Sequence, residues 1–161
     1  RTRKRSMKPN YVIIPLVTVL TAVIGSRFTS SGLGSWYSTL NLPPWTPSGS
    51  IIGLVWTTIF TFSAASALLL WNTPSAKAKL PLLAGIFLLN AVLNALWSYL
   101  FFSRHLVGAA DFEALLLDVT VIALAILAWP FSRLASVLLM PYAAWVAFAA
   151  HLTYNVWKLN R

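Results

Sequence analysis

The stretch Leu80–Phe102, LPLLAGIFLLNAVLNALWSYLFF, contains no charged side chain. An uncharged apolar run of this kind is typical of a transmembrane helix, because about 20 residues are needed to cross the hydrocarbon core of a bilayer. Its two amides, Asn90 and Asn94, lie one helical turn apart and share a stripe with Trp97 and Phe101. The stretch therefore predicts a membrane-spanning helix with one polar, aromatic face.

Similar apolar stretches flank this helix on both sides. In the chain of 161 residues, 58% are apolar and 9% charged, whereas an average soluble domain has about 25% charged residues. The sequence therefore predicts an all-α membrane protein, a five-transmembrane-helix bundle in a single domain, and excludes a soluble enzyme, a secreted disulfide scaffold and a disordered chain. The expected helices lie at about 11–27, 49–71, 80–102, 107–129 and 134–157, with a long first loop at about 28–48.

The net charge of +9 comes mostly from one end of the chain. Five of the twelve basic residues fall in the basic N-terminal segment 1–10, and the others flank the apolar stretches singly. Basic residues beside hydrophobic spans follow the positive-inside rule, which places the N-terminus on the cytosol-like side. We therefore expect membrane lipid, and no nucleic acid, as a partner. Because the chain begins with Arg1 and not with methionine, we expect a fragment or a processed form.

Few residues suit metal binding or covalent catalysis. The chain has no cysteine, which excludes disulfides and thiolate ligands. His105 and His151 have no carboxylate or second histidine at metal-binding spacing. We expect His105 to be solvated in a turn and His151 to be packed or interfacial, with no cofactor, no metal site and no catalytic residue.

Polar and aromatic residues gather in the half of the bundle that faces the first loop. Trp36, Tyr37 and Trp45 lie in that loop, while Asn94 and Trp97 lie late in the third helix. This asymmetry predicts a cavity that opens toward the first loop, with the loop as its lid. An amide in hydrocarbon needs a hydrogen-bonding partner, so we expect Asn94 to face a ligand, and Asn90 either to face a ligand or to join two helices.

All three acids of the chain lie in the fourth helix. Asp111 and Glu113 are explained by the helix N-terminus and the membrane interface. Asp118 lies near the midplane, where an aspartate costs about 2.5–3.5 kcal/mol. We expect Asp118 to form a hydrogen bond at the level of Asn90 and Asn94; a proton relay is the alternative.

Four ordered motifs resemble a known family. They are Gly25-Ser-Arg-Phe28, then Trp36-Tyr37-x-x-Leu40-x-x-Pro43-x-Trp45-x-Pro47 followed by Val55-Trp56, then Leu93-Asn94-x-x-Trp97-Ser98-x-x-Phe101-Phe102, and finally Pro141-Tyr142-x-x-Trp145-x-x-Phe148-Ala149. The chain resembles the translocator protein family (TspO/MBR), also called tryptophan-rich sensory proteins or peripheral benzodiazepine receptors, over about 25–160.

The resemblance implies a five-helix bundle, expected as a homodimer, that binds porphyrin or haem, sterols and benzodiazepine-type drugs under its first loop. It implies a multi-pass protein of the mitochondrial outer membrane if eukaryotic, of the ER or Golgi if plant-type, or of the cell envelope membrane if bacterial. The implied ligand-binding residues are Trp56, Asn94, Trp97, Trp145, Ala149, Phe60, Trp36, Tyr37 and Trp45, and the implied sterol-binding residues are Leu152, Tyr154 and Lys158.

Two other functions stay open. One is a light- and oxygen-dependent enzyme that degrades porphyrin through tryptophan radicals, as proposed for bacterial relatives, for which Trp36 or Trp45 would be the residues to test. The other is a proton-coupled small-molecule transporter, which would depend on Asp118. The family's lysine before the first-loop proline is Leu42 here, which removes a partner for a porphyrin propionate.

Overall fold

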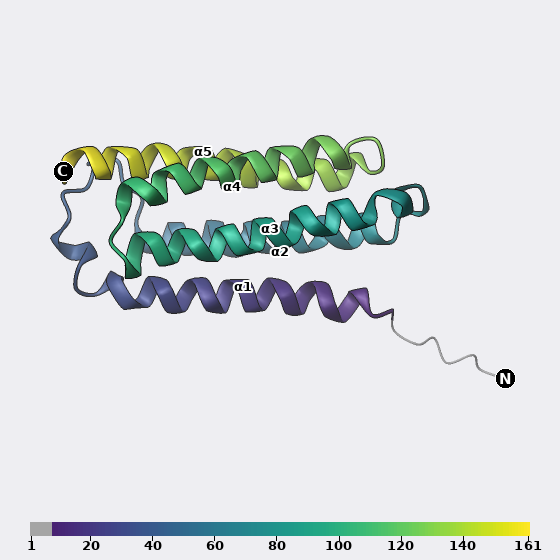
Figure 1. Ribbon diagram of the computed structural model, residues 1–161, viewed down its shortest axis with the longest axis horizontal. Helices are drawn as coiled ribbons and strands as arrows, with labels where there is room; N and C mark the ends of the chain where they lie inside the picture. The colour runs from purple at the N-terminus through teal and green to yellow at the C-terminus, as the bar shows by residue number, and fades with distance from the viewer. Residues whose placement is uncertain (1–7) are drawn as a thin grey trace.

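The structure is a computed structural model that describes residues 8–161. Arg1, Arg3, Lys4 and Arg5, which supply most of the charge of the predicted N-terminal segment, lie outside the described residues. Five long helices run along the longest axis of the molecule (Figure 1). They are α1 (Asn10–Leu33), α2 (Gly49–Trp71), α3 (Leu80–Ser98), α4 (Val107–Ala128) and α5 (Arg133–Leu159).

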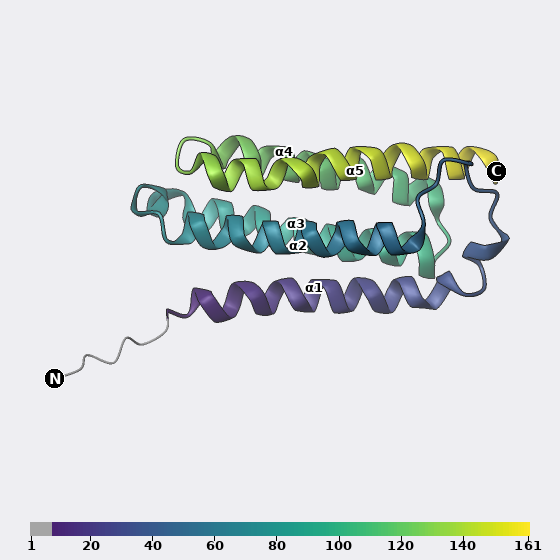
Figure 2. The same cartoon turned by 180° about the vertical axis from the view of Figure 1, so that it is seen from behind.

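The two ends of the bundle differ. The connection 34–48 between α1 and α2, the turn between α3 and α4, and the C-terminus lie at one end, which we call the lid end (Figure 2). The beginning of α1, the connection between α2 and α3, and the turn between α4 and α5 lie at the opposite end, which we call the N-terminal end. The first connection includes a single 3₁₀ turn at Tyr37–Thr39, and the second is the 3₁₀ segment Pro74–Lys79.

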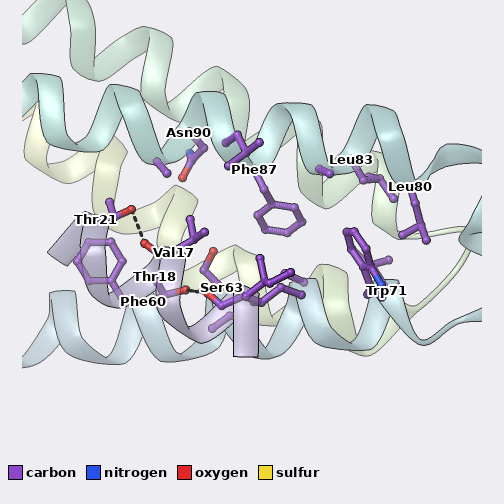
Figure 3. A pocket seen from close by; sticks show the side chains of 18 of the residues that line it. Val17, Thr18, Thr21, Phe60, Ser63, Trp71, Leu80, Leu83, Phe87 and Asn90 are labelled. Carbon is purple, nitrogen blue, oxygen red and sulfur yellow. Dashed lines mark hydrogen bonds between the residues drawn. The ribbon is translucent and has the colours of Figure 1, made fainter. Parts of the chain in front are cut away.

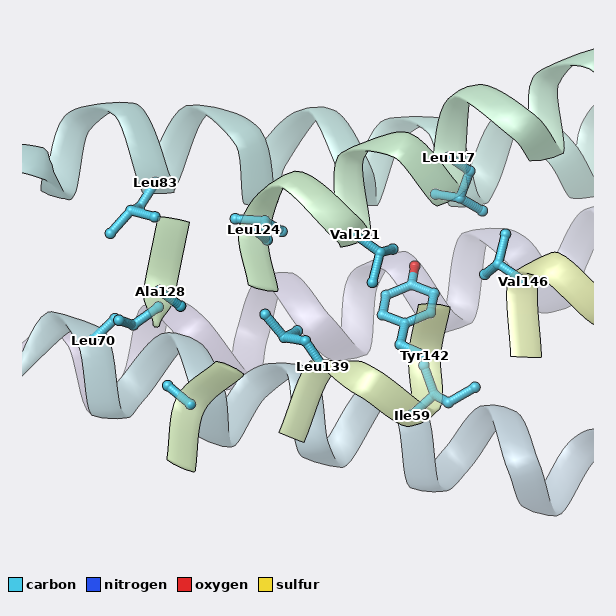
Figure 4. Packing of buried hydrophobic residues seen from close by; sticks show 11 residues of the cluster. Ile59, Leu70, Leu83, Leu117, Val121, Leu124, Ala128, Leu139, Tyr142 and Val146 are labelled. Carbon is cyan, nitrogen blue, oxygen red and sulfur yellow. The ribbon is translucent and has the colours of Figure 1, made fainter. Parts of the chain in front are cut away.

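The helices pack as a closed ring in the order α4, α5, α2, α1, α3 and back to α4. The most extensive of these contacts is the one between α4 and α5. Residues that are buried between α4 and α5 recur every three or four positions, as for Leu117, Val121 and Leu124 on α4. They form the core with Leu139 and Tyr142 of α5, and the Tyr142 ring lies among them (Figure 4).

Within residues 8–161, four helical stretches are long and apolar enough to cross a membrane: α1, α2, the stretch Pro74–Ser103 that includes α3, and α5. α4 has 22 residues, which at 1.5 Å per residue span about 33 Å, enough for the hydrocarbon core. It differs from the other four helices in its charge, because it contains all three acids of the chain. The all-helical prediction of five helices in one bundle is confirmed, and large apolar side chains such as Leu54 and Val92 point outward, as lipid contact requires.

α1 ends at Leu33, so the predicted start of the first loop at residue 28 is wrong. The segment after Arg27 is rich in serine and glycine, which suggested a loop. The hydroxyls of Thr29 and Ser30 instead donate to helix carbonyls one turn earlier, at 2.9 and 2.7 Å. Gly32 lets α1 approach the π-helical turn Tyr99–Ser103 that follows α3, since a Cβ there would overlap the carbonyl of Phe102. The hydroxyls are therefore satisfied within the helix, and close packing at Gly32 holds this helical segment against the bundle.

α3 continues into one π-helical turn, Tyr99–Ser103. The widened turn is closed by the amide of Arg104, which donates to the Tyr99 carbonyl at 2.9 Å. Single π turns in helices frequently occur at functional sites. Here the extra residue brings both Phe101 and Phe102 into the interior at the lid end.

Candidate functional site

The Tyr142 hydroxyl joins α5 to α3 at the centre of the ring. It donates to Oδ1 of Asn90 at 2.9 Å and accepts from Nδ2 of Asn94 at 3.0 Å. Asn90 also donates to the Thr120 hydroxyl of α4 at 2.8 Å. The three buried groups satisfy one another, which a polar group in hydrocarbon requires. Asn90 therefore joins α3, α4 and α5. Asn94 is bonded to Tyr142, and the Tyr142 ring meets Trp56 edge-on, with ring centroids 6.1 Å apart.

Trp97 is part of an aromatic group around the π turn. Its ring stacks on Phe101 with centroids 5.1 Å apart and planes 15° apart. Phe101 in turn meets Trp36 of the first connection edge-on at 5.4 Å and Tyr37 at 6.2 Å. Two predicted lid residues are thereby linked to one predicted pocket residue, through a phenylalanine that the π turn places between them.

Trp145 belongs to a second aromatic group, on α5. Its ring lies 5.2 Å from Phe148, whose other neighbour is Trp45 of the first connection at 5.8 Å. Trp45 also stacks on His151 at 5.6 Å. Ala149, between these aromatic residues in the chain, is half-buried. The third predicted lid residue is therefore held by α5. His151, which we expect to be packed or interfacial, is exposed and stacks on Trp45.

The first connection is also fastened by a hydrogen-bonded pair that the sequence did not reveal. The Asn160 side chain, just beyond α5, accepts from the backbone amide of Asn41 and donates to its carbonyl, both at 2.9 Å. Leu40 and Leu42 on either side pack against the apolar cluster of Phe101, Phe102 and α4. Leu42 therefore helps to hold the connection against this cluster.

Three buried polar groups near the lid end have no hydrogen-bond partner within the described part of the chain. They are the indole N–H groups of Trp97 and Trp145 and both carboxyl oxygens of Glu113. The Asn90–Thr120 bond sets the antiparallel alignment of α3 and α4. Trp97 lies seven residues after Asn90, and Glu113 lies seven residues before Thr120. Because seven residues make about two turns in each antiparallel helix, Trp97 and Glu113 lie at the same level. An unpaired donor and an unpaired carboxyl thus lie at one depth on neighbouring helices.

Two expectations about the acids are wrong. Glu113 was assigned to the membrane interface, but its side chain is only 4% exposed and follows the buried face of α4. Asp118 forms no bond to the amides of α3 among residues 8–161, because Asn90 pairs with Thr120 instead; one Asp118 oxygen is buried and unpartnered. The helical repeat of small and apolar residues through Ala110, Ala114 and Leu117 could have placed Glu113 correctly.

A cavity of about 230 Å³ lies between α1, α2 and α3 (Figure 3). Its walls include the beginning of α1 and the end of α2, so it lies toward the N-terminal end. This cavity therefore differs from the predicted one, which opens at the lid end. Thr21, Phe60 and Asn90 lie at its inner end, and Trp71, Leu80 and Leu83 at the other. Phe60, a predicted ligand residue, thus faces this cavity and also contacts Trp56 at 5.7 Å.

The predicted sterol residues do not share one surface. Tyr154 and Lys158, one turn apart on α5, are both exposed, and Tyr154 lies 6.1 Å from Trp157. Leu152 points inward and packs with the cluster of Phe101 and Phe102. The segment therefore presents a tyrosine and a lysine to the membrane, and uses its leucine to hold the helix.

Comparisons with known proteins agree with the arrangement of motifs. The TspO/MBR family model matches residues 12–158. A tryptophan-rich protein TspO from Bacillus cereus is 33% identical over 126 residues, covering 78% of this chain and 81% of the relative. A human translocator protein is 33% identical over 148 residues, covering 90% and 86%. A membrane protein from Bacillus subtilis is 38% identical over 125 residues, covering 78% and 80%.

Proposed function

Because the chain belongs to the TspO/MBR family, we propose that this integral membrane protein binds hydrophobic planar ligands at the lid end of its bundle. Tetrapyrroles such as protoporphyrin IX, sterols and benzodiazepine-type compounds are the proposed classes. Buried aromatic walls with a few hydrogen-bonding groups are typical of sites for such ligands.

The observation that carries the proposal is the pair of unpartnered indole N–H groups. Trp97 and Trp145 are half-buried, and each ring is held from one side by a phenylalanine, Phe101 and Phe148 respectively. A buried indole N–H usually has a hydrogen-bond partner. Two such donors, on α3 and α5, which Tyr142 joins through Asn94, suit a ligand with acceptor atoms on its edge, such as a carboxylate or a carbonyl.

Trp56, Tyr142 and Asn94 form the proposed floor of this site. Their contacts are with one another, through the Tyr142 ring and hydroxyl. Asn94 could exchange its bond to Tyr142 for one to a ligand, since the hydroxyl would keep its bond to Asn90. Trp36, Tyr37 and Trp45 would then close over the ligand with the first connection.

A fluorescence titration with protoporphyrin IX in nanodiscs tests the proposal. We expect saturable quenching of tryptophan emission by the wild-type protein, and affinity about five- to thirtyfold weaker for Trp145→Leu and Asn94→Ala, because each removes a wall or a hydrogen bond worth about 1–2 kcal/mol. Trp129→Leu is the matched control, since Trp129 is exposed at the N-terminal end.

Equal, unsaturable quenching in all four proteins would contradict the proposal. Porphyrin absorbance recorded in light and air during the same titration separates binding from degradation. A constant porphyrin concentration supports a binding protein, whereas steady loss that stops on replacing Trp36 or Trp45 would support the enzymatic alternative.

A further inference from the structure

The cavity between α1, α2 and α3 shares Tyr142 with the floor of the proposed lid-end site, and the rest of its lining extends from there toward the N-terminal end. Its lining is mostly aliphatic and aromatic, and side chains at its rim, including Ile13 and Leu88, are more than half exposed on the surface that faces lipid. The cavity is therefore reached from the hydrocarbon of the bilayer.

Four polar side chains in its wall have hydrogen-bond partners within the protein. Thr18 and Thr21 donate to carbonyls of their own helix at 2.9 Å, and Asn90 and Tyr142 bond to each other. Ser63 and Trp71 are the other polar lining residues, and the rest of the wall is apolar. An apolar cavity of this kind favours an apolar occupant over water.

The size of the cavity selects a single chain. A volume of about 230 Å³ is below the roughly 300–1,000 Å³ of sites that enclose drug-sized ligands. Along α3 its lining runs from Leu80 to Ala91, about 16 Å at 1.5 Å per residue. A long and narrow apolar space suits one alkyl chain better than a tetrapyrrole ring.

The outer end of the cavity adjoins a cluster of lysines. Leu80, in the cavity wall, directly follows Lys79, and Lys77 lies in the same 3₁₀ segment. Lys8 donates from Nζ to Oδ1 of Asn72 at 3.3 Å, next to the lining residue Trp71. All three acids of the chain lie in α4, so no carboxylate side chain on α1, α2 or α3 neutralises this cluster.

We infer that an anionic phospholipid binds here, with one acyl chain in the cavity and its phosphate against Lys8, Lys77 and Lys79. Basic clusters beside transmembrane helices attract anionic headgroups. The charge and the cavity act together: the lysines select the headgroup, and the groove between the three helices holds the chain. The site needs neither the lid nor the aromatic groups.

Native mass spectrometry of lipid adducts tests this inference. We expect the wild-type protein to bind phosphatidylglycerol about tenfold more tightly than phosphatidylcholine with the same chains. The double variant Lys77→Gln/Lys79→Gln should lose that preference, and Ala67→Phe, which fills the cavity, should reduce the affinity for phosphatidylglycerol. Ala84→Leu is a milder filling variant that keeps the test open if Ala67→Phe does not fold.

The matched controls are Arg133→Gln, which removes a charge at the same end of the bundle, on the first residue of α5, and Ala144→Phe, on an exposed face of α5. Both should bind lipid as the wild type does. A photoactivatable group on the acyl chain should label peptides of α1, α2 and α3.

Equal affinity for the two lipids would overturn the inference. So would unchanged binding in both filling variants, which would indicate headgroup attraction without an occupied cavity, or labelling confined to α4 and α5. Soluble glycerol phosphate is expected to compete poorly; efficient competition would show a free-phosphate site instead. Porphyrin titration of the same variants separates this site from the lid-end site, because porphyrin affinity should not change.

Discussion

Trp45 in the first connection stacks on His151 of α5, with ring centroids 5.6 Å apart and planes 16° from parallel. Trp36 makes the same kind of contact with His105, at 4.2 Å and 13°. His105 follows the π turn with a positive φ of 58°, a conformation that few non-glycine residues adopt. The two halves of the connection are therefore held by different parts of the bundle, α5 and the turn between α3 and α4.

The two halves should loosen independently. Trp45→Ala removes contacts with Phe148 and His151, and aromatic contacts of this kind are worth about 0.5–1.5 kcal/mol. We expect amide hydrogen exchange of residues 41–48 to become about two- to tenfold faster. Trp36→Ala is the matched control and should accelerate exchange in residues 35–40. If either variant accelerates exchange equally across the whole connection, the two attachments are not independent.

Removing the Tyr142 hydroxyl should destabilise the bundle. In Tyr142→Phe both Asn90 and Asn94 lose a partner inside the membrane, and we expect the free energy of unfolding in detergent to fall by about 1–2 kcal/mol. Tyr154→Phe, on the exposed face of α5, should change it little. Equal stability of the two variants would show that the amides find other partners.

Gly32 should not tolerate a side chain. Its missing Cβ leaves room for the backbone carbonyl of Phe102, so Gly32→Ala must displace α1 from the π turn after α3 and should cost about 1–3 kcal/mol of unfolding free energy. Gly53→Ala, in α2, meets open space within this chain and should be neutral or stabilising. A neutral Gly32→Ala would mean that α1 is not closely packed there.

Glu113 should be replaceable with a gain in stability. A buried carboxyl without a partner costs about 1–3 kcal/mol, so Glu113→Met should raise the free energy of unfolding by an amount in that range. Glu113→Gln keeps an unpaired polar group and should give no such gain. A less stable Met variant would reveal that the carboxyl has a partner in solution, and the same two variants can be titrated with porphyrin to show whether that partner is the ligand.

The sequence predicted the helices well because their apolar stretches are long and uncharged. It predicted the first loop poorly, since a serine-rich segment is helical only where its hydroxyls can bond to carbonyls and its glycines meet another helix, as Gly32 does. That second condition is a contact between α1 and the π turn after α3, which no local pattern contains.

Contacts between helices also limited what the sequence could predict of the proposed site. Residue types and depth placed Trp56, Asn94, Trp97 and Trp145 in one group, and their role in ligand binding stays a prediction. Tyr142, which joins Trp56 to Asn94, and the Asn41–Asn160 pair depend on which helices are neighbours in the ring. The N-terminal-end cavity was missed because its wall is apolar, and apolar residues do not reveal from sequence alone whether they enclose a space.

The acids of α4 have a consequence for how the protein is made. An aspartate or a glutamate in a lone helix opposes its partition from the translocon into lipid, and α4 has three acids in 22 residues. The next helix begins only five residues after α4 ends, and the two share most of their buried surfaces. α4 should therefore enter the bilayer as a hairpin with α5, after α5 has left the ribosome. Because α5 also contributes Trp145, Phe148 and His151, the proposed ligand site is completed only once α5 has been inserted.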